Sequence, residues 1–223
     1  LSGLLQPTSG DILINGEKVK IDSPKKAAEL GIGMVHQHFM LIDAFTVTEN
    51  IILGDEPVKN GFVLDKQSAV ENILQLSKQY GLEVDPKALV EDISVGMQQR
   101  VEILKTLYRG ADILIFDEPT AVLTPQEIDE LMVILKNLAN EGKSVILITH
   151  KLDEIRAVAD QVTVIRRGQS IDTFPVAGVS SQELADIMVG RSVSFKTVKR
   201  DATPSDVVLD VQDLTVKDAR GVE

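Results

Sequence analysis

Two adjacent carboxylates follow a short apolar run near the middle of the sequence. Residues 113–116 are Ile-Leu-Ile-Phe, and Asp117 and Glu118 come directly after them. A second apolar run, residues 145–148, ends two positions before His150. In open α/β sheets, ligands bind in the crevice beyond the carboxyl ends of the strands. Adjacent residues that leave a strand point in opposite directions, so one acid can hold a Mg²⁺ ion while the other addresses a water molecule.

The same three residues also have purely structural explanations. Asp117 and Glu118 can be solvated surface acids that precede a turn. His150 can be a histidine that ordinary hydrogen bonds hold at the end of a strand. Both interpretations stay open at the level of residue spacing.

A second candidate site lies at the start of a predicted helix. Residues 93–100 are Ile-Ser-Val-Gly-Met-Gln-Gln-Arg, and the apolar face of the helix that they open is formed by Met97, Val101, Leu104 and Tyr108. Ser94 is placed to cap the helix, and Gly96 leaves backbone N–H groups unobstructed at the positive end of the helix dipole. That end favours anions, phosphate above all. An ordinary cap with a polar first turn is the alternative.

Strands and helices alternate around these residues. Residues 112–116 and 144–148 each have one polar residue followed by a continuous apolar run, which is typical of parallel strands that helices cover on both faces. Between them, residues 124–127 (Thr-Pro-Gln-Glu) have the spacing of a capping box, with Pro at the first helical position. Apolar residues then repeat at intervals of three and four. The order strand, helix, strand predicts a βαβ unit and the α/β fold class.

Composition excludes several classes of protein. The 223 residues include 23 Lys and Arg against 34 Asp and Glu, a net charge of −11 that disfavours nucleic acid as a partner. The absence of Cys excludes disulfides and Cys-based metal sites. No apolar run approaches the roughly 20 residues that a membrane-spanning helix needs. The sequence begins Leu-Ser-Gly-Leu-Leu, without an initiator Met or a secretory signal, so we expect it to be part of a longer chain.

Taken together, the candidate segments resemble the motifs of ATP-binding cassette (ABC) ATPases. Residues 93–100 resemble the L-S-G-G-Q signature, and residues 112–120 resemble the Walker B strand with its acid pair. His150 matches the switch histidine, and Gln37, within the segment Gly-Met-Val-His-Gln-His of residues 33–38, matches the Q-loop glutamine. The resemblance implies a P-loop NTPase fold, with a RecA-like parallel-sheet core and a helical subdomain.

The resemblance also implies a mechanism with ATP and Mg²⁺. Two cassettes would sandwich two ATP molecules head to tail. Asp117 would hold the Mg²⁺ shell, Glu118 would polarise the attacking water, and His150 would contact the γ-phosphate. Gln37 would touch Mg²⁺ and the water, and would report to a transmembrane partner through the helical subdomain.

In the same way, the resemblance assigns Ser94, Gly96 and Gln98 to the nucleotide that the opposite cassette holds. This sequence departs from the signature at two positions, because Val95 replaces a Gly and Met97 replaces a Gln. Backbone N–H donors survive both changes.

Part of the family's nucleotide site is missing from the 223 residues. No G-x-x-x-x-G-K-[ST] motif occurs, and residues 1–5 resemble the last turn of the helix that normally follows it. We therefore expect a cassette that is truncated at its N-terminus and inactive alone, with its first strand and P-loop upstream. Thr124 stands where the family usually has Asp, which puts the usual contact between cassettes in doubt.

Other segments indicate which ABC proteins the chain resembles. Residues 121–127 and 188–191 look like the first cassette of tandem-cassette ATPases of bacterial importers for simple sugars and nucleosides. Residues 33–41 and 148–152 are closer to the nucleoside branch. The resemblance implies two transmembrane permease subunits, a substrate-binding lipoprotein, a place on the cytoplasmic side of the cell membrane, and no nucleic acid partner.

We divide the chain accordingly. Residues 1–191 form the first cassette, with the helical subdomain at about 39–110, and residues 192–205 form a polar linker. The apolar run that begins at Val207 reads as the opening strand of a second cassette over residues 206–223. The alternative is a terminal strand that pairs with an edge of the first domain.

Two alternative functions belong to other classes. A soluble ABC ATPase that acts on ribosomes or DNA would carry a strongly basic arm or a long coiled-coil insertion, and the sequence has neither. A non-catalytic interaction module remains open, and nucleotide-binding measurements separate it from an ATPase.

Overall fold

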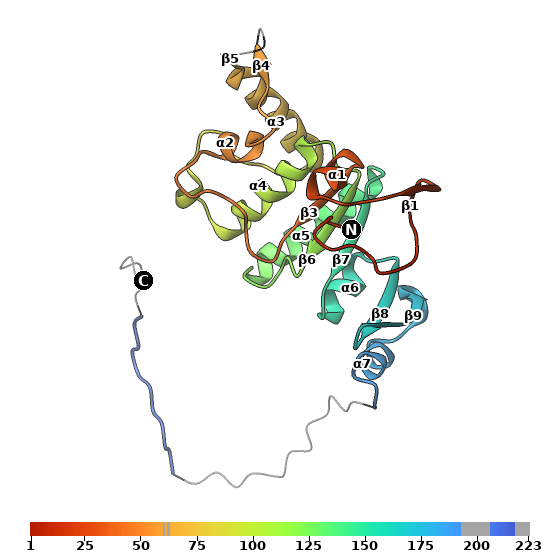
Figure 1. The fold of residues 1–223 in the computed structure, drawn as a ribbon. Coiled ribbons are helices and arrows are strands. Elements are labelled where there is room, and N and C mark those ends of the chain that lie inside the picture. Colours follow the sequence, from red (N-terminus) through yellow and green to blue (C-terminus); the bar gives the residue numbers. More distant parts are fainter. Residues whose placement is uncertain (60, 62, 193–205, 217–223) are drawn as a thin grey trace.

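The computed structural model describes residues 1–59, 61, 63–192 and 206–216. Its centre is a parallel sheet of three strands in the order β3 (Ile32–Val35), β6 (Ile113–Asp117) and β7 (Ser144–Ile148) (Figure 1). In the register of this sheet, Val35 pairs with Phe116 and Asp117 pairs with Ile148. The predicted α/β class and both predicted parallel strands are therefore confirmed.

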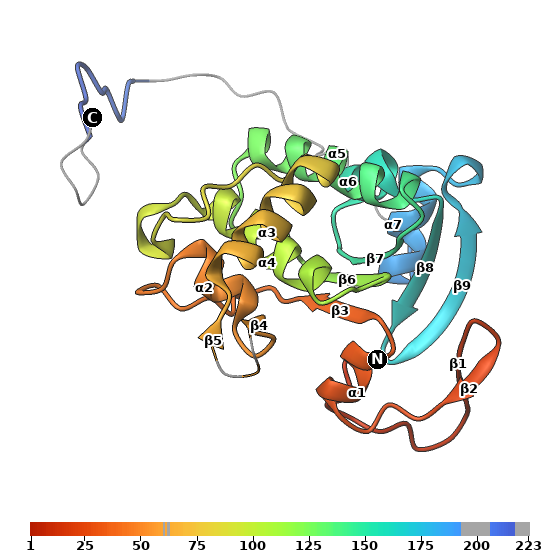
Figure 2. The ribbon, with the colours of Figure 1, turned by 90° about the horizontal axis from the view of Figure 1, so that it is seen from above.

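Two long helices cover one face of the sheet. They are α4 (Val95–Tyr108) and α5 (Pro125–Asn140), and Figure 2 shows them on the side of the sheet opposite α1 (Pro24–Glu29). The core between these helices and the sheet contains side chains that are fully buried: Leu104, Leu114, Phe116, Leu135 and Leu138. The capping box predicted for α5 is present, because the Thr124 side chain and the Glu127 side chain each bond the other's backbone N–H. The capping box thus fixes the residue at which α5 begins, and with it the direction of the apolar face of the helix.

The second face of the sheet is covered over β3 and β6 only. There α1 and the hairpin of β1 (Ile12–Ile14) and β2 (Glu17–Val19) bury a small core that includes Ile32 and Ile115. Over β7 this face is open, and Ile146 and Ile148 are 40% and 46% exposed.

The region that the sequence predicts as a helical insertion is mainly helical. It contains α2 (Val47–Ile52), α3 (Lys66–Tyr80), a 3-10 helix (Val90–Asp92) and α4, together with a short hairpin of β4 (Val58–Lys59) and β5 (Val63–Leu64). The two hairpin strands have two residues each, which is too short for an alternation of apolar and polar residues to be visible in the sequence. The far half of α4 also packs on the sheet, where a Cβ at Gly33 would meet the side chains of Thr106 and Ala111.

The part of the chain that follows the sheet contains two short helices and a hairpin. After α6 (Leu152–Val158), a hairpin forms from β8 (Gln161–Arg166) and β9 (Gln169–Pro175). A 3-10 helix (Val176–Gly178) then leads into α7 (Ser181–Val189), which a capping box at Ser180 opens.

The end of the chain carries the predicted linker and opening strand. Residues 193–205 of the linker lie outside the described part of the chain, as do residues 217–223. Residues 206–216 are exposed throughout and form no strand, so the expected strand is not formed here. A strand needs a neighbour for its backbone groups, and no described strand pairs with this segment. Across the described residues, no helix is long and apolar enough to cross a membrane.

Candidate active site

The parallel register brings the three candidate residues to one edge of the sheet. β6 ends at Asp117 and β7 ends at Ile148, and these two residues are partners in the ladder. Glu118 and His150 therefore leave neighbouring strands at the same level. The Nδ1 atom of His150 lies 3.2 Å from Oε1 of Glu118, so the histidine and the second acid are in hydrogen-bond contact.

The backbone at Glu118 has an unusual conformation. Its φ is +44°, in the left-handed region that residues other than Gly seldom adopt. The N–H of Glu118 still donates to the carbonyl of Ile148 at 2.9 Å, which continues the ladder one residue beyond the strand. Such conformations cluster at functional sites, where the surrounding structure holds them. Here the conformation leaves the Glu118 side chain, 36% exposed, beside His150.

Asp117 differs from its neighbour in having no partner. Its residue is half-buried at the end of β6, and its carboxylate bonds no side chain or backbone group in the described part of the chain. A carboxylate oxygen without a partner at a sheet edge suits Mg²⁺, which takes one or two protein carboxylates together with water and phosphate oxygens. Among the described residues, no group of three or more His, Cys, Asp or Glu is placed to hold a metal ion.

Gln37 lies at the same edge, two residues beyond the end of β3. β3 and β6 are parallel neighbours, and Val35 at the end of β3 pairs with Phe116. The segment that contains Gln37 therefore leaves the sheet beside the end of β6. The roles of Gln37 and Asp117 toward Mg²⁺ stay predictions.

The signature segment, residues 93–100, lies apart from this group. Ser94 caps α4 as predicted, with its hydroxyl accepting from the N–H of Met97 at 3.2 Å. The Gln98 amide donates to the carbonyl of Val90 at 3.2 Å. No bond among the described residues joins Ser94, Gly96 or Gln98 to the acids at the sheet edge. The predicted site residues thus form two groups within one chain.

A carboxylate of the chain lies against the N-terminus of α4. Oε1 of Glu127 accepts from the backbone N–H of Gly96 at 3.1 Å, and the other oxygen accepts from Thr124. The N–H of Thr124 is the largest cause that holds the pKa of the Glu127 carboxyl below its ordinary value. A Cβ at Gly96 would lie 2.3 Å from the same Oε1, so only glycine permits this approach. The sequence indicated Glu127 as a capping residue, but it carried no signal for the contact with Gly96.

Sequence reasoning also missed a buried polar network beside the sheet edge. Thr120 and Thr149 both donate to the carboxylate of Glu154, which is 4% exposed in α6. The available signal was weak, because a Glu in the first turn of a helix is ordinarily a solvated residue.

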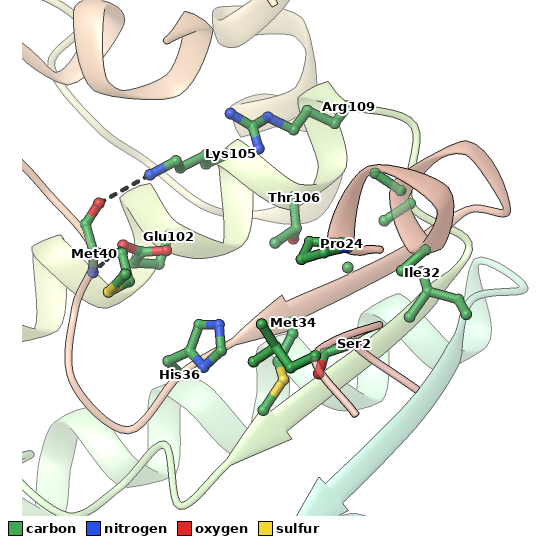
Figure 3. Close-up of a pocket in the computed structure, with 15 residues that line it drawn as sticks. Ser2, Pro24, Ile32, Met34, His36, Met40, Glu102, Lys105, Thr106 and Arg109 are labelled. Carbon is green, nitrogen blue, oxygen red and sulfur yellow. Dashed lines mark hydrogen bonds between the residues drawn. The ribbon is translucent and has the colours of Figure 1, made fainter. Parts of the chain in front are cut away.

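A groove of about 290 Å³ lies at the junction of the helical region and the sheet, on the edge of β3. Figure 3 shows α4 along one wall, with Glu102 and Lys105 reaching Met40. Oε1 of Glu102 accepts from the N–H of Met40 at 2.7 Å, and Nζ of Lys105 donates to its carbonyl at 3.0 Å. Burial lowers the pKa of Lys105. His36 and Met40, on either side of Gln37 in the sequence, both line the groove.

Comparisons with known proteins show the family to which the chain belongs. Residues 1–121 match the family described as ABC transporter. The chain is 69% identical over 221 residues to a nucleoside import ATP-binding protein, NupA, of Lactococcus lactis, and 63% identical over 223 residues to a guanosine import ATP-binding protein, NupO, of Bacillus subtilis. The alignments cover 99% and 100% of this chain and 44% of each relative, so the chain spans less than half the length of these proteins.

Among solved structures, the chain is similar to cbiO1 of Clostridium perfringens, which is part of the ABC transporter complex cbiONQ. The TM-score is 0.67 at 27% identity, over 84% of this chain and 73% of that one.

Proposed function

Because the chain belongs to the ABC transporter family, we propose that it is the first of two cassettes in the ATP-hydrolysing subunit of a bacterial nucleoside importer. The observation that carries this proposal is the sheet edge at which Glu118 contacts His150 beside the unpartnered carboxylate of Asp117. A base, an orienting imidazole and a cation ligand are the parts that phosphoryl transfer to water needs from this side of the nucleotide.

Each residue of the edge has one task in this scheme. Glu118 accepts a hydrogen bond from the attacking water and takes its proton as the water attacks the γ-phosphate of ATP. His150 holds the Glu118 carboxylate through Nδ1, and its remaining ring nitrogen is free to face the phosphate. Asp117 and Gln37 would hold Mg²⁺, which when bound neutralises charge on the phosphate oxygens. Ser94 and Gly96 would meet the nucleotide of the second cassette once the Glu127 carboxylate has released the N–H of Gly96.

The open part of the sheet supports a segment that precedes Leu1. β7 pairs with β6 on one edge, and no described strand pairs with its other edge. On the uncovered face, Ile146 and Ile148 expose apolar surface that a parallel strand normally buries. An upstream strand could pair with the free edge of β7, and the helix after its P-loop could cover Ile146 and Ile148. The chain alone should therefore lack micromolar affinity for MgATP, and the full-length protein should have it; calorimetric titration of both measures this difference.

The two nucleoside-type relatives favour nucleosides as the transported solutes. They are 69% and 63% identical to this chain, whereas a glucose import ATP-binding protein of Haloferax volcanii is 43% identical and a ribose import ATP-binding protein of Rubrobacter xylanophilus is 42% identical. A cassette does not touch the solute, so this choice is made by the permease with which it pairs.

The groove on the edge of β3 supports permease docking. Its lining is mainly apolar, and His36 and Met40 place it next to Gln37. A permease helix seated there would contact the strand end that leads into the Q-loop, and thereby the predicted Mg²⁺ ligand. The cassette would then lie on the cytoplasmic side of the membrane, with two permease subunits and, outside the cell, a substrate-binding lipoprotein.

Reconstitution tests this function. The full-length protein and its permease subunits in vesicles should take up a nucleoside only with ATP, and the nucleoside with its binding protein should raise the ATPase rate. Gln37→Ala should reduce that stimulation by a larger factor than it reduces the unstimulated rate. Stimulation by ribose or glucose and none by nucleosides would contradict the assignment of the solute.

A further inference from the structure

Two threonine hydroxyls next to the candidate active site meet at one buried carboxylate. Thr120 lies two residues after Glu118, and Thr149 lies one residue before His150. Oγ1 of Thr120 donates to Oε1 of Glu154 at 2.5 Å, and Oγ1 of Thr149 donates to Oε2 at 2.7 Å. Glu154 is 4% exposed and Thr120 is 2% exposed. The carboxylate therefore bridges the loops that follow β6 and β7, away from solvent.

Lys151 completes this network. Its Nζ donates to Oγ1 and to the carbonyl oxygen of Thr120, at 2.8 and 3.2 Å, and forms an ion pair with Glu154 at 3.3 Å. Its backbone N–H donates to Oγ1 of Thr149 at 3.1 Å. Every oxygen of the carboxylate has a partner, and a buried polar network that is fully satisfied makes its surroundings rigid. The two loops can separate only if several of these bonds break together.

We propose that Glu154 is a positioning residue for ATP hydrolysis, an inference that rests on the proposed function. Glu118 has the left-handed φ of +44°, which persists only when the surrounding structure determines it. Glu154 helps to hold this conformation. It binds Thr120, in the turn after Glu118, and Thr149, which precedes His150. The 3.2 Å contact between the His150 ring and the Glu118 carboxylate is then a consequence of the bridge.

The test uses Glu154→Gln in the native full-length protein. Glutamine keeps the size of the side chain, but its NH₂ group cannot accept the second hydroxyl donor, and the neutral amide cannot balance the charge of Lys151. Misplacement of a reacting group by about 1 Å can cost about 10²-fold in rate, so we expect kcat to fall by about that factor. The KM for ATP should stay near that of the wild type, since the network touches no predicted nucleotide contact. Asp153→Asn is the matched control, because it removes an exposed acid from the same turn of α6.

A second readout does not depend on turnover. The ring ¹⁵N resonances of His150, assigned with a His150→Gln variant, report the hydrogen bond at Nδ1. They should shift in Glu154→Gln and stay in place in Asp153→Asn. If Glu154→Gln fails to fold, Thr149→Val provides a second test, because valine has nearly the same shape as threonine but lacks the hydroxyl donor. Thr149→Ser keeps the hydroxyl and should retain most of the kcat that Thr149→Val loses.

The outcomes separate the two proposals. A wild-type protein that hydrolyses no ATP would overturn the proposed function, and the His150 resonances would still decide the role of Glu154. Unchanged resonances, an unchanged kcat, or a loss of kcat accompanied by an equal loss of ATP affinity would overturn the positioning role. A purely stabilising network would leave the His150 resonances and the kcat per folded molecule unchanged.

Discussion

The backbone N–H of Gly96 donates to the carboxylate of Glu127 across 31 residues of sequence. Glu127 also holds the first residues of α5 through its capping box with Thr124. The N-terminus of α4, where the signature lies, is thereby tied to the start of the helix that follows the acid pair. If the N-terminus of one helix moves, either this hydrogen bond breaks or the N-terminus of the other helix moves with it.

Gly96→Ala tests that contact through the sign of its effect. Alanine ordinarily stabilises a helix relative to glycine by roughly 0.5–1 kcal/mol. Here the new Cβ would lie 2.3 Å from Oε1 at the end of the flexible Glu127 side chain. Glu127 must then give up its hydrogen bond to Gly96, so we expect a net loss of about 0.5–2 kcal/mol in the free energy of unfolding. Urea denaturation measures the change.

Two further variants bracket this result. Gly178→Ala should be nearly neutral, because a Cβ there meets nothing within 4 Å. In a Glu127→Ala background the obstacle is gone, and Gly96→Ala should become neutral or stabilising. If Gly96→Ala were stabilising in the wild-type background, the contact with Glu127 would carry no weight.

The capping box of α2 predicts a dependence of stability on pH. The backbone N–H of Thr46, followed by the Lys66 side chain, lowers the pKa of Glu49 from 4.5 to about 2. A carboxylate with a depressed pKa stabilises the fold above its unfolded pKa, and this contribution disappears as the pH falls through the folded pKa. Glu49→Gln should therefore reduce the loss of stability between pH 4.5 and 2, as chemical denaturation at a series of pH values can show. Glu17→Gln, at an exposed acid of β2, should leave the profile unchanged.

Much of this fold follows from local patterns. The two parallel strands that the sequence predicts, β6 and β7, contain continuous apolar runs, and the box of Thr124 and Glu127 marks the start of α5 directly. The edge with Asp117, Glu118 and His150 could be predicted because the carboxyl ends of parallel strands meet. The bridge at Glu154 could not, since it depends on the turns after two strands arriving at one buried helix position. The hairpin of β1 and β2 is likewise hard to foresee, because its second strand, Glu-Lys-Val, has no apolar periodicity.

The uncovered face of β7 predicts a difference between the isolated chain and the full-length protein. Ile148 is 46% exposed in this structure. If the upstream strand and its helix cover this face, Ile148→Ala should cost about 2–5 kcal/mol in the full-length protein, the range for buried Ile. In the 223-residue chain the cost should be clearly smaller. Val133→Ala, at a side chain of α5 that is 60% exposed, should cost little in either. Equal costs of Ile148→Ala in both proteins would show that nothing packs there.

In the proposed function, Glu118 is the base that activates water at a site it shares with His150. Glu118→Gln in the full-length protein keeps the size of the side chain and removes its basicity. Loss of a general base typically lowers turnover by about 10²- to 10⁴-fold, while ATP binding should be retained. Because a second cassette could mask the effect, the decisive measurement is single-turnover hydrolysis of radiolabelled ATP at the site that contains Glu118. We expect the Glu118→Gln protein to hold bound, unhydrolysed ATP at that site. Hydrolysis there at the wild-type rate would contradict the role of Glu118 as the base.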